Sequence, residues 1–497
     1  MSIVRLNATD GTPVEYDTEK QAGSGGMKDV FFSPDRKYVV GWFRKPLDVN
    51  SQDRLETIAG TYRQRILEQP GGEYWRNLFC WPTHVVKDGA RTGVVAPTYQ
   101  AHYFFEFGSQ NNDMLAIKGK EKEGKWFASA SHRKKFLDAR ELGHWRSHIR
   151  VSLLISRAVR RLHAAGLAHS DLSYKNVLID PRGGHACIID IDGLVVPNKY
   201  PPDVVGTPDF IAPEVMRTLK LDLRDPQRHL PCIATDRHAL AVLIYMYLLY
   251  RHPLRGGRIH DPDPARDEEL MMGEKALFVE HPQDAGNRVK PGDLKPGELP
   301  YGDPAKLPYT AVGPYLKELF DRAFIDGLHA PHLRPTADDW ERALVKTDDL
   351  VLPCPNTSCP QQWFPFDNTR KPACPFCGTP YNSPLPVLNL YSSRGGKFMP
   401  DNRRLMVYDQ RTLGSWHVWR HVIPGERLTE EQKRPVADFQ IVAGKWHIIN
   451  RRLPAMRELT TSTPIPPNSM TELREGQQIL LSPDEGGRLM QVQVANL

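Results

Sequence analysis

Three short polar segments, in a fixed order, constrain the fold of this 497-residue chain more than any other feature. They are His169–Asn176 (HSDLSYKN), Ile189–Gly193 (IDIDG) and Gly206–Glu214 (GTPDFIAPE). Each alone is weak, because such residues also occur in ordinary polar turns and surface loops. Their order and spacing together are more specific, and the carboxylate and amide oxygens that they supply are ligands that Mg²⁺ prefers.

In order and spacing, the three segments resemble the catalytic loop, the metal-binding loop and the Ala-Pro-Glu motif of the protein kinase superfamily. The resemblance spans about residues 12–346 and implies a bilobal α+β domain that transfers a phosphoryl group from ATP. The hydrophobic pattern agrees with two lobes, because strand signals precede mainly helical ones. It predicts a β-hairpin over 30–43 and helices at 52–69, 147–165, 235–250 and 313–326.

The resemblance assigns roles to the polar residues of the first two segments. Asp171 would orient the attacking hydroxyl and accept its proton, and Asn176 would steady Asp171 and hold a Mg²⁺ ion. Asp190 would bind the Mg²⁺ that bridges the β- and γ-phosphates. The register is ambiguous because Asp192, not Asp190, precedes Gly193; we prefer Asp190, whose distance from Asn176 is closer to the kinase spacing.

The first segment, His169–Asn176, is called the catalytic segment below, and it also departs from the kinase pattern. Position 170 holds Ser where most kinases place Arg, so a phosphorylated activation segment would lack its usual Arg partner. Ser173 replaces a lysine, and Lys175 lies two residues further on. Lys175 is expected to contact the γ-phosphate, with an ordinary solvated lysine as the alternative.

Two further positions are expected to have structural roles. Asp236 begins a long apolar run to Tyr250 that resembles the buried central helix of the large lobe, where an Asp braces the catalytic loop. Arg334 stands where kinases place the Arg that pairs with the Glu of the Ala-Pro-Glu motif, here Glu214.

A glycine-rich stretch, GSGGMKDV at 23–30, matches the kinase nucleotide loop except that Lys28 replaces the third glycine. Gly23 and Gly25 are expected to let backbone amides approach the phosphates. The strand that should carry the ATP lysine, Val39–Phe43, has none.

With-No-Lysine kinases move this cation to the position that matches Lys28. We therefore hypothesise that Lys28 contacts the ATP phosphates. Two alternatives stay open: Lys45 could serve in a shifted register, or the phosphate cation has been lost and Lys28 is a surface residue.

The resemblance also implies an acidic partner for the lysine and an apolar adenine site. The partner should come from the helix at 52–69, and we choose Glu56 over Glu68. Val95–Tyr99 would form the hinge. The adenine would be sandwiched by Val30, Val40 and Leu178, which are equally plausible as core residues.

Seven cysteines are unevenly placed, and four of them, Cys354, Cys359, Cys374 and Cys377, lie within 24 residues. Four thiolates in two pairs suit a closed tetrahedral Zn²⁺ site, and the segment 354–380 resembles a zinc ribbon. Two disulfides are disfavoured by the reducing compartment that we expect for this chain. The loop 360–373 has only Arg370 and Lys371 as cations, which argues against a nucleic-acid role.

Residues 387–497 carry short strand signals separated by polar turns, which predicts an all-β sandwich. The closing pattern, with Trp446–Asn450 and Leu473–Leu481, is similar to the end of a forkhead-associated (FHA) domain, a phosphothreonine-binding module. The Ser-x-x-His signature of that family is absent, so phosphopeptide binding does not follow from the pattern.

Composition excludes several classes. Lys plus Arg (65) minus Asp plus Glu (59) leaves a net charge of +6, which argues against a polybasic nucleic-acid binder. The N-terminus lacks a signal-peptide pattern, and the longest apolar run, Ala239–Tyr250, is shorter than a membrane span. We therefore expect a cytoplasmic protein that binds neither membrane nor nucleic acid.

The displaced lysine, the cysteine appendage and the segment Gly273–Pro282 together resemble the bacterial kinases of tellurite-resistance-associated triads. That resemblance implies Ser/Thr protein phosphorylation in stress signalling, with a Mg²⁺-dependent Ser/Thr phosphatase and a von Willebrand factor A-type (VWA) protein as partners. The competing hypothesis is a pseudokinase that scaffolds these partners, and a third is a nucleic-acid adaptor that uses the ribbon. Asp171, Asn176 and Asp190 favour catalysis, because a scaffold needs none of them.

Overall fold

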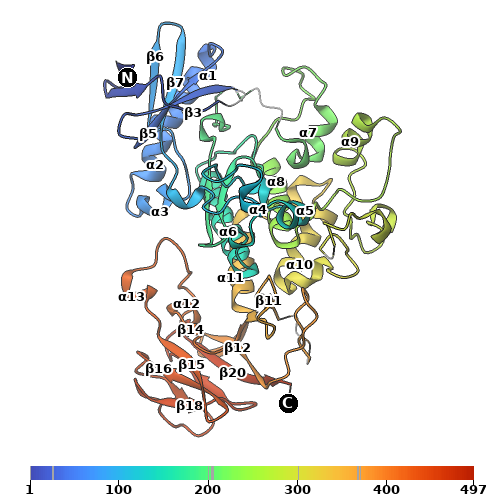
Figure 1. Cartoon of the computed structure of the whole chain (residues 1–497). Helices are drawn as coiled ribbons and strands as arrows, with labels where there is room; N and C mark the ends of the chain where they lie inside the picture. Colours follow the sequence, from blue (N-terminus) through green and yellow to red (C-terminus); the bar gives the residue numbers. More distant parts are fainter. Residues whose placement is uncertain are drawn as a thin grey trace. The chain divides into compact units, whose positions relative to one another are not determined.

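The computed structural model describes residues 2–24, 27–199, 201–202, 206–299, 301–366, 369 and 371–496. The chain divides into two compact units, and Figure 1 shows the course of the chain through both. The first unit comprises residues 1–143, 147–309 and 318–341, and the second comprises 144–146, 310–317 and 342–497.

The first unit begins with β-structure. A five-stranded antiparallel sheet has the order β3 (Gln21–Ser24), β4 (Lys28–Phe32), β5 (Tyr38–Phe43), β7 (Arg91–Pro97) and β6 (His84–Asp88). The pairing of β4 with β5 confirms the predicted hairpin. One face of the sheet packs on a second hairpin, β1 (Ile3–Asn7) with β2 (Pro13–Asp17). The predicted domain start at residue 12 falls inside that hairpin.

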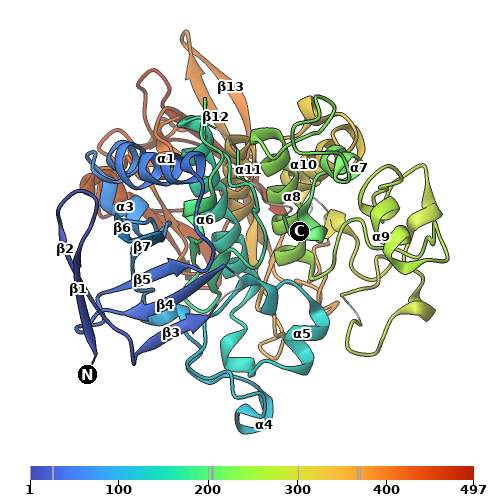
Figure 2. The same cartoon turned by 90° about the horizontal axis from the view of Figure 1, so that it is seen from above.

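The other face of the sheet is covered by the helix predicted at 52–69 (Figure 2). It runs from α1 (Val49–Thr57) through a π-helical turn into α2 (Arg63–Leu67). Asp48 caps its start, because its side chain accepts a hydrogen bond from the amide of Ser51 at 2.9 Å. Leu55 and Ala59 of the helix pack against two valines of the sheet, which fixes the rotation of α1.

The helices predicted further along the chain are present. They are α6 (Trp145–Ala164), α8 (Ile233–Leu249), and α10 (Pro314–Asp321), which continues into a π-helical turn, Arg322–Asp326. Helix α8 is apolar around its whole circumference and is buried, as a helix at the centre of a domain must be. The other described helices of five or more residues are α3 (Gly72–Arg76), α5 (Ala130–Lys135), α7 (Pro213–Thr218), α9 (Pro264–Met272) and α11 (Ala337–Asp349). The four-residue segment α4 (Gln110–Asp113) contains left-handed residues.

A two-stranded hairpin explains why two motifs distant in sequence meet. Strand β8 (Val177–Asp180) starts directly after Asn176, and β9 (His185–Ile188) ends just before Asp190. Val177 lies opposite Ile188 in the antiparallel register. The hairpin therefore brings the end of the catalytic segment beside the start of the segment Ile189–Gly193, here called the Asp-x-Asp segment after Asp190 and Asp192.

The second unit is mainly antiparallel β-structure, in line with the predicted sandwich. A five-stranded sheet has the order β13 (Lys397–Met406), β12 (Leu385–Arg394), β20 (Arg488–Ala495), β19 (Gln478–Leu480) and β17 (Arg457–Glu458). A four-stranded sheet has the order β14 (Thr412–Leu413), β15 (Ala437–Val442), β16 (Lys445–Asn450) and β18 (Met470–Glu472). Residues of both sheets, such as Leu390 and Phe439, share one core. The likeness to FHA domains stays a prediction.

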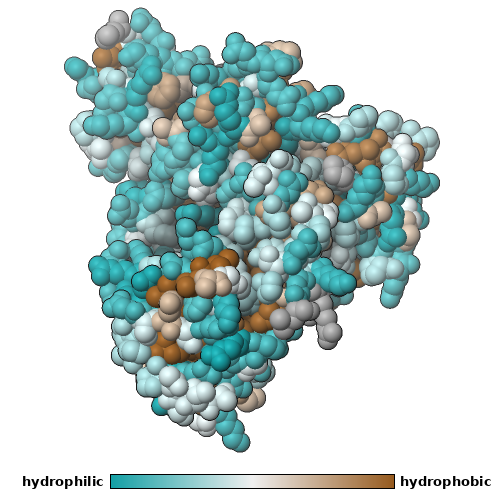
Figure 3. All heavy atoms as spheres, turned by 60° about the horizontal axis from the view of Figure 1, so that its bottom comes forward, coloured by the Kyte–Doolittle hydropathy of each residue, from teal (hydrophilic) through white to brown (hydrophobic). Residues whose placement is uncertain are grey.

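Short elements complete the second unit. Strands β10 (Val351–Pro353) and β11 (Trp363–Pro365) pair next to the cysteine segment, and α12 (Ser415–Val418) and α13 (Glu430–Lys433) lie in the connections of the sheets. The face drawn in Figure 3 is mostly hydrophilic, with smaller hydrophobic patches. Among the helices that the structure describes, none has the length and apolar character needed to cross a membrane.

Candidate active site

Asp171 is held by hydrogen bonds from both sides. Its Oδ1 accepts from the backbone amide of Thr207 at 2.8 Å, and its Oδ2 accepts from Nδ2 of Asn176 at 3.1 Å. The same Asn176 nitrogen donates to the Asp171 carbonyl at 2.8 Å. The expected contact between Asn176 and Asp171 is therefore present, and it leaves the Asn176 side-chain oxygen available for another partner.

The catalytic segment is braced from beneath by α8. The Asp236 carboxylate, which is buried, accepts a hydrogen bond from the amide of His169 at 2.8 Å. The ring of His169 in turn lies 2.9 Å from the carbonyl of Ile189, just before the Asp-x-Asp segment. The expected brace by Asp236 is confirmed, and His169 links the catalytic segment to the residue before Asp190.

The expected pair of Glu214 and Arg334 is also confirmed. Two guanidinium nitrogens of Arg334 donate to the two carboxylate oxygens of Glu214 at 2.8 and 2.7 Å, and both side chains are buried. This bidentate geometry is the strong form of the Arg–carboxylate pair.

Two serines that depart from the kinase pattern have contacts of their own. Ser170 Oγ donates to the carbonyl of Gly193 at 2.7 Å and so ties the catalytic segment to the Asp-x-Asp segment. The buried Ser173 accepts a hydrogen bond from Thr207 Oγ1 at 3.2 Å. Thr207 has no expected role in the sequence patterns, although it belongs to the Gly-Thr-Pro-Asp stretch of the third segment.

Two residues of the site adopt a backbone conformation that is unfavourable for a non-glycine residue. Ser170 and Asp190 have φ values of 41° and 59°, in the left-handed region that non-glycine residues rarely adopt. Strained residues of this kind persist where the surrounding contacts determine them, and they cluster at functional sites.

Lys28 reaches the Asp-x-Asp segment from β4. Its Nζ lies 2.7 Å from Asp192 Oδ2 and 3.2 Å from Asp190 Oδ1. Burial lowers the pKa of Lys28, but the two carboxylates outweigh it and hold that pKa above its ordinary value. Lys45 is exposed and has no ion pair among the described residues. Of the two lysines considered, the structure brings only Lys28 to the site.

The predicted partner of this lysine is wrong. Glu56 is 45% exposed and pairs with Lys87 of β6 at 2.9 Å. The packing of Leu55 and Ala59 on the sheet sets the phase of α1 and turns Glu56 toward β6 instead of toward Lys28. The sequence offered a signal for the true partner, because the Asp-x-Asp pattern has a second carboxylate at Asp192.

Of the three apolar residues expected around the adenine, two remain candidates and one does not. Val30 of β4 lies on the same side of its strand as Lys28, two residues away, and Leu178 is fully buried beside Tyr103 and Cys187. Val40 does not belong with them, because it packs with Tyr16 on the opposite face of the sheet.

The loop and hinge positions can be described in part. Gly23 pairs with Val30 across β3 and β4, and Gly25 lies outside the described residues. The predicted hinge at 95–99 starts too early, since β7 continues through Pro97 and only Thr98 and Tyr99 follow the strand.

Lys175 is exposed, and no carboxylate lies within ion-pair distance among the residues that the structure describes. With Tyr174 it lines a cavity of about 530 Å³, to which Trp126 and Met246 also contribute. The cavity adjoins the catalytic segment.

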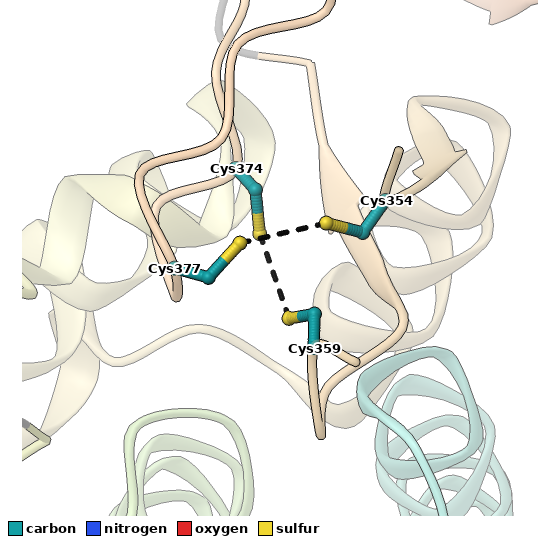
Figure 4. A group of neighbouring side chains, drawn as sticks. All are labelled: Cys354, Cys359, Cys374 and Cys377. Carbon is teal, nitrogen blue, oxygen red and sulfur yellow. Dashed lines mark hydrogen bonds between the residues drawn. The ribbon is translucent and has the colours of Figure 1, made fainter. Parts of the chain in front are cut away.

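The four clustered cysteines converge in the second unit (Figure 4). Their sulfurs all lie within 4.8 Å of one another, with Cys354 Sγ 3.6 Å from Cys377 Sγ and Cys359 Sγ 4.0 Å from Cys374 Sγ. A tetrahedron of thiolates at the usual Zn–S bond length has sulfurs about 3.8 Å apart, whereas a disulfide needs about 2 Å. The donor set fits Zn²⁺.

Residues 114–287 match the family model of the protein kinase domain. This chain contains a protein kinase domain. The match covers Asp171, Asn176 and the Asp-x-Asp segment, whereas Lys28 and the four clustered cysteines lie outside it. The position of Lys28 in the site is therefore known from the structure alone.

Relatives of the kinase domain include serine/threonine-protein kinase PkaB of Streptomyces coelicolor, 32% identical over 106 residues that make up 19% of this chain and 23% of the relative. Human serine/threonine-protein kinase H1 is 33% identical over 138 residues, 24% of this chain and 30% of the relative. Human protein kinase C delta type is 33% identical over 99 residues, 19% of this chain and 13% of the relative. The chain thus spans less than a third of the length of each of these relatives.

Proposed function

We propose that the chain is a Ser/Thr protein kinase that transfers the γ-phosphate of ATP to a protein hydroxyl. The observation that carries the proposal is the fixed carboxylate of Asp171, held by Asn176 and Thr207. The hydrogen bond from Ser170 to Gly193 joins its segment to that of Asp190 and Asp192, the two carboxylates that the ammonium of Lys28 contacts. The kinase domain and the names of its relatives support this reaction.

In the proposed reaction, Asp171 accepts a hydrogen bond from the acceptor hydroxyl and takes its proton. The hydroxyl oxygen forms a bond to the γ-phosphorus while the bond to the β,γ-bridging oxygen breaks, and ADP departs with the electron pair. Positioning and charge neutralisation are the main contributions of the protein in such transfers. Lys175, free of a carboxylate partner among the described residues, is placed to meet the charge on the γ-phosphate.

The Asn176 and Asp190 oxygens are the proposed Mg²⁺ ligands, and hard oxygen donors of this kind fit the ion. Bound Mg²⁺ supplies neutralisation of phosphate charge. Lys28 contributes a second positive charge toward the phosphates from β4, in the place of the lysine that β5 lacks. Val30 and Leu178 remain the proposed apolar contacts of the adenine, and Gly23 and Gly25 the proposed phosphate-loop glycines.

The decisive experiment measures transfer from γ-labelled Mg-ATP to a generic protein substrate and to the chain itself, for wild type and for Asp171→Asn. We expect transfer by wild type and a loss of about a hundredfold or more in the variant. Wild type that binds ATP but labels nothing would establish the pseudokinase alternative. Phosphoamino-acid analysis of the product would separate Ser/Thr from Tyr acceptors.

We also propose that the four cysteines hold a structural Zn²⁺ that folds the segment 354–380. Four ligands leave no open position for catalysis, and a segment this small has little core without its metal. Metal analysis of the purified chain should give one zinc per molecule, and Cys374→Ser should remove it. Zinc retained by that variant would contradict the assignment.

The biological setting is proposed from the sequence resemblance to the tellurite-resistance-associated kinases alone. The resemblance implies a role in bacterial stress signalling and a cytoplasmic location. It also implies two partners, a Mg²⁺-dependent Ser/Thr phosphatase and a VWA protein. The β-rich second unit, possessing the two-sheet core described above, would then serve as the targeting module. Co-purification of the chain with the products of neighbouring genes, and loss of their labelling in Asp171→Asn, would test this setting.

A further inference from the structure

The ammonium of Lys28 needs a fixed position if it is to meet a phosphate group. A lysine side chain has four rotatable carbon bonds, so a carboxylate partner is the usual way to hold it. In this structure the closest carboxylate is that of Asp192, at 2.7 Å, and the next is that of Asp190, at 3.2 Å. Both come from the same three-residue stretch of the chain.

Helix α1 supplies no carboxylate to this lysine. Glu56 pairs with Lys87 on β6. The side chain of α1 that is buried near the site is Arg54, a cation: burial lowers the pKa of its guanidinium, and the charges of Asp48 and Asp192 oppose that shift. The charge that α1 presents to the site is therefore the reverse of what Lys28 requires.

Asp190 and Asp192 differ in their surroundings. The Asp192 side chain is 10% exposed and that of Asp190 is 48% exposed. Asp192 also sits in a short helical turn with the buried Ile191, and the turn is tied to the catalytic segment by the hydrogen bond from Ser170 to Gly193. The more exposed carboxylate can turn to a metal ion, whereas the enclosed one stays with the lysine.

We propose that Asp192 is the positioning residue for Lys28, so that the phosphate lysine is anchored by the metal-binding segment and not by helix α1. The inference rests on the proposed kinase function, since it assigns the second carboxylate of Asp-x-Asp to the lysine and the first to Mg²⁺. One consequence is that displacement of α1 does not break the lysine's ion pair. The hydrogen bond from Ser170 to Gly193 instead ties the two carboxylates that hold Lys28 to the catalytic segment.

The ion pair can be tested without any turnover. Lysine acetylation by a water-soluble reagent, followed by mass spectrometry of the full chain, gives a rate for each lysine. We expect Asp192→Asn to speed acetylation of Lys28 about tenfold, because removal of a carboxylate partner frees the amine. The rate at Lys87 should not change. The matched control, Glu56→Gln, should do the opposite: it speeds Lys87 and leaves Lys28 unchanged.

The functional half of the inference is tested by steady-state kinetics. We expect Asp192→Asn to lower kcat by about tenfold to a hundredfold and to change the KM for ATP by less than about threefold, as for a misplaced catalytic group. Asp192→Glu should recover part of the rate, and Glu56→Gln should equal wild type. Melting temperatures of all variants show whether the chain remains folded.

Each result has a defined meaning. Unchanged Lys28 acetylation in Asp192→Asn, or a wild-type kcat in that variant, overturns the inference while the kinase proposal stands. A higher Mg²⁺ requirement in Asp192→Asn, without a change at Lys28, makes Asp192 the metal ligand and overturns it as well. If wild type transfers no phosphate, the kinase proposal fails, and the acetylation rates still decide whether Asp192 holds the lysine.

Discussion

The active site and the second unit both bury carboxylates among cations, but they satisfy them differently. In the active site, Asp192 faces one ammonium, and Asp190 is half exposed. In the second unit, Asp349 accepts from Arg403 Nε at 2.7 Å, from Arg411 Nη2 at 3.0 Å and from His417 at 2.9 Å. The first group keeps oxygen atoms available, and the second uses them all.

This difference follows from where the two groups lie. Asp349 is the last residue of α11, at the helix end where the macrodipole disfavours negative charge. It is 2% exposed, so the structure stabilises it with two guanidinium groups and a histidine. An active-site carboxylate cannot be saturated in this way, because it must exchange partners with a ligand. We call a network closed when all carboxylate oxygens in it have protein partners, and open when an oxygen remains available for a ligand. The closed network has a structural role, and the open one can bind a ligand.

The largest effect on stability in this comparison is expected from Asp349→Asn. The change removes the carboxylate that the buried Arg403 and Arg411 share, and among the described carboxylates it leaves Arg411 with only the more distant one of Asp348, at 3.9 Å. Breaking a buried ion pair costs about 3–5 kcal/mol. We expect the free energy of unfolding of the second unit to fall by about that amount. Hydrogen exchange of β12 and β20 during denaturation of the full chain would measure it.

The matched control is Asp438→Asn, which removes the exposed pair of Asp438 with Arg451 on the same β-rich unit. Exposed pairs contribute about 0–1 kcal/mol, so this variant should stay near wild type. Equal losses in the two variants would mean that the closed network has no special weight.

A second test uses pH. The amide of Gly414 donates to Nδ1 of His417 at 2.9 Å, so Nε2 carries the proton and donates to Asp349. Burial, opposed by Asp349 and helped by the neighbouring guanidinium groups, lowers the pKa of His417 to about 4. The unfolded chain then binds a proton that the folded one does not, and stability falls as the pH falls from about 6.5 to 4.

The expected loss for this group is at most about 3 kcal/mol over that range. His417→Gln lacks the titrating ring, so its stability should fall less steeply with acid than that of wild type, while other groups act in both. Denaturant titrations at pH 7, 5.5 and 4.5 give the two slopes. Parallel slopes would show that His417 is not the group that titrates.

The two regions also differ in how far the sequence predicts them. Asp171, Asn176 and Asp190 lie in ordered segments whose spacing is imposed by the β8–β9 hairpin, so a local pattern identifies them. The partners of Asp349 are 54, 62 and 68 residues away in sequence. No short-range pattern joins residues that far apart. They meet because β13, the connection that follows it and α12 all pass close to Asp349 in the folded unit.

The wrong prediction in the active site, Glu56 as the partner of Lys28, also concerns a contact between residues that are distant in sequence. The sequence favours Glu56 because it lies on the helix that is expected to supply the acidic partner. The rotation of that helix about its axis, however, is set by the packing of Leu55 and Ala59 on the sheet. Lys28 is predictable because the sequence shows both that β5 contains no lysine and that a lysine follows the glycines. Contacts within a motif are predictable, and contacts that depend on how a helix rotates on a sheet are not.

The smallest expected effect is the change in stability caused by Asp171→Asn. Asparagine keeps the shape and the oxygen that accepts from Thr207, and Asn176 keeps its bond to the residue 171 carbonyl. Only the hydrogen bond at 3.1 Å is replaced by two facing donors, in a half-buried site. We expect the free energy of unfolding of the first unit to change by less than about 1 kcal/mol, although transfer is lost. Thermal unfolding of the same samples used for the transfer assay would measure it, and a loss as large as that of Asp349→Asn would mean that the catalytic carboxylate belongs to a closed structural network after all.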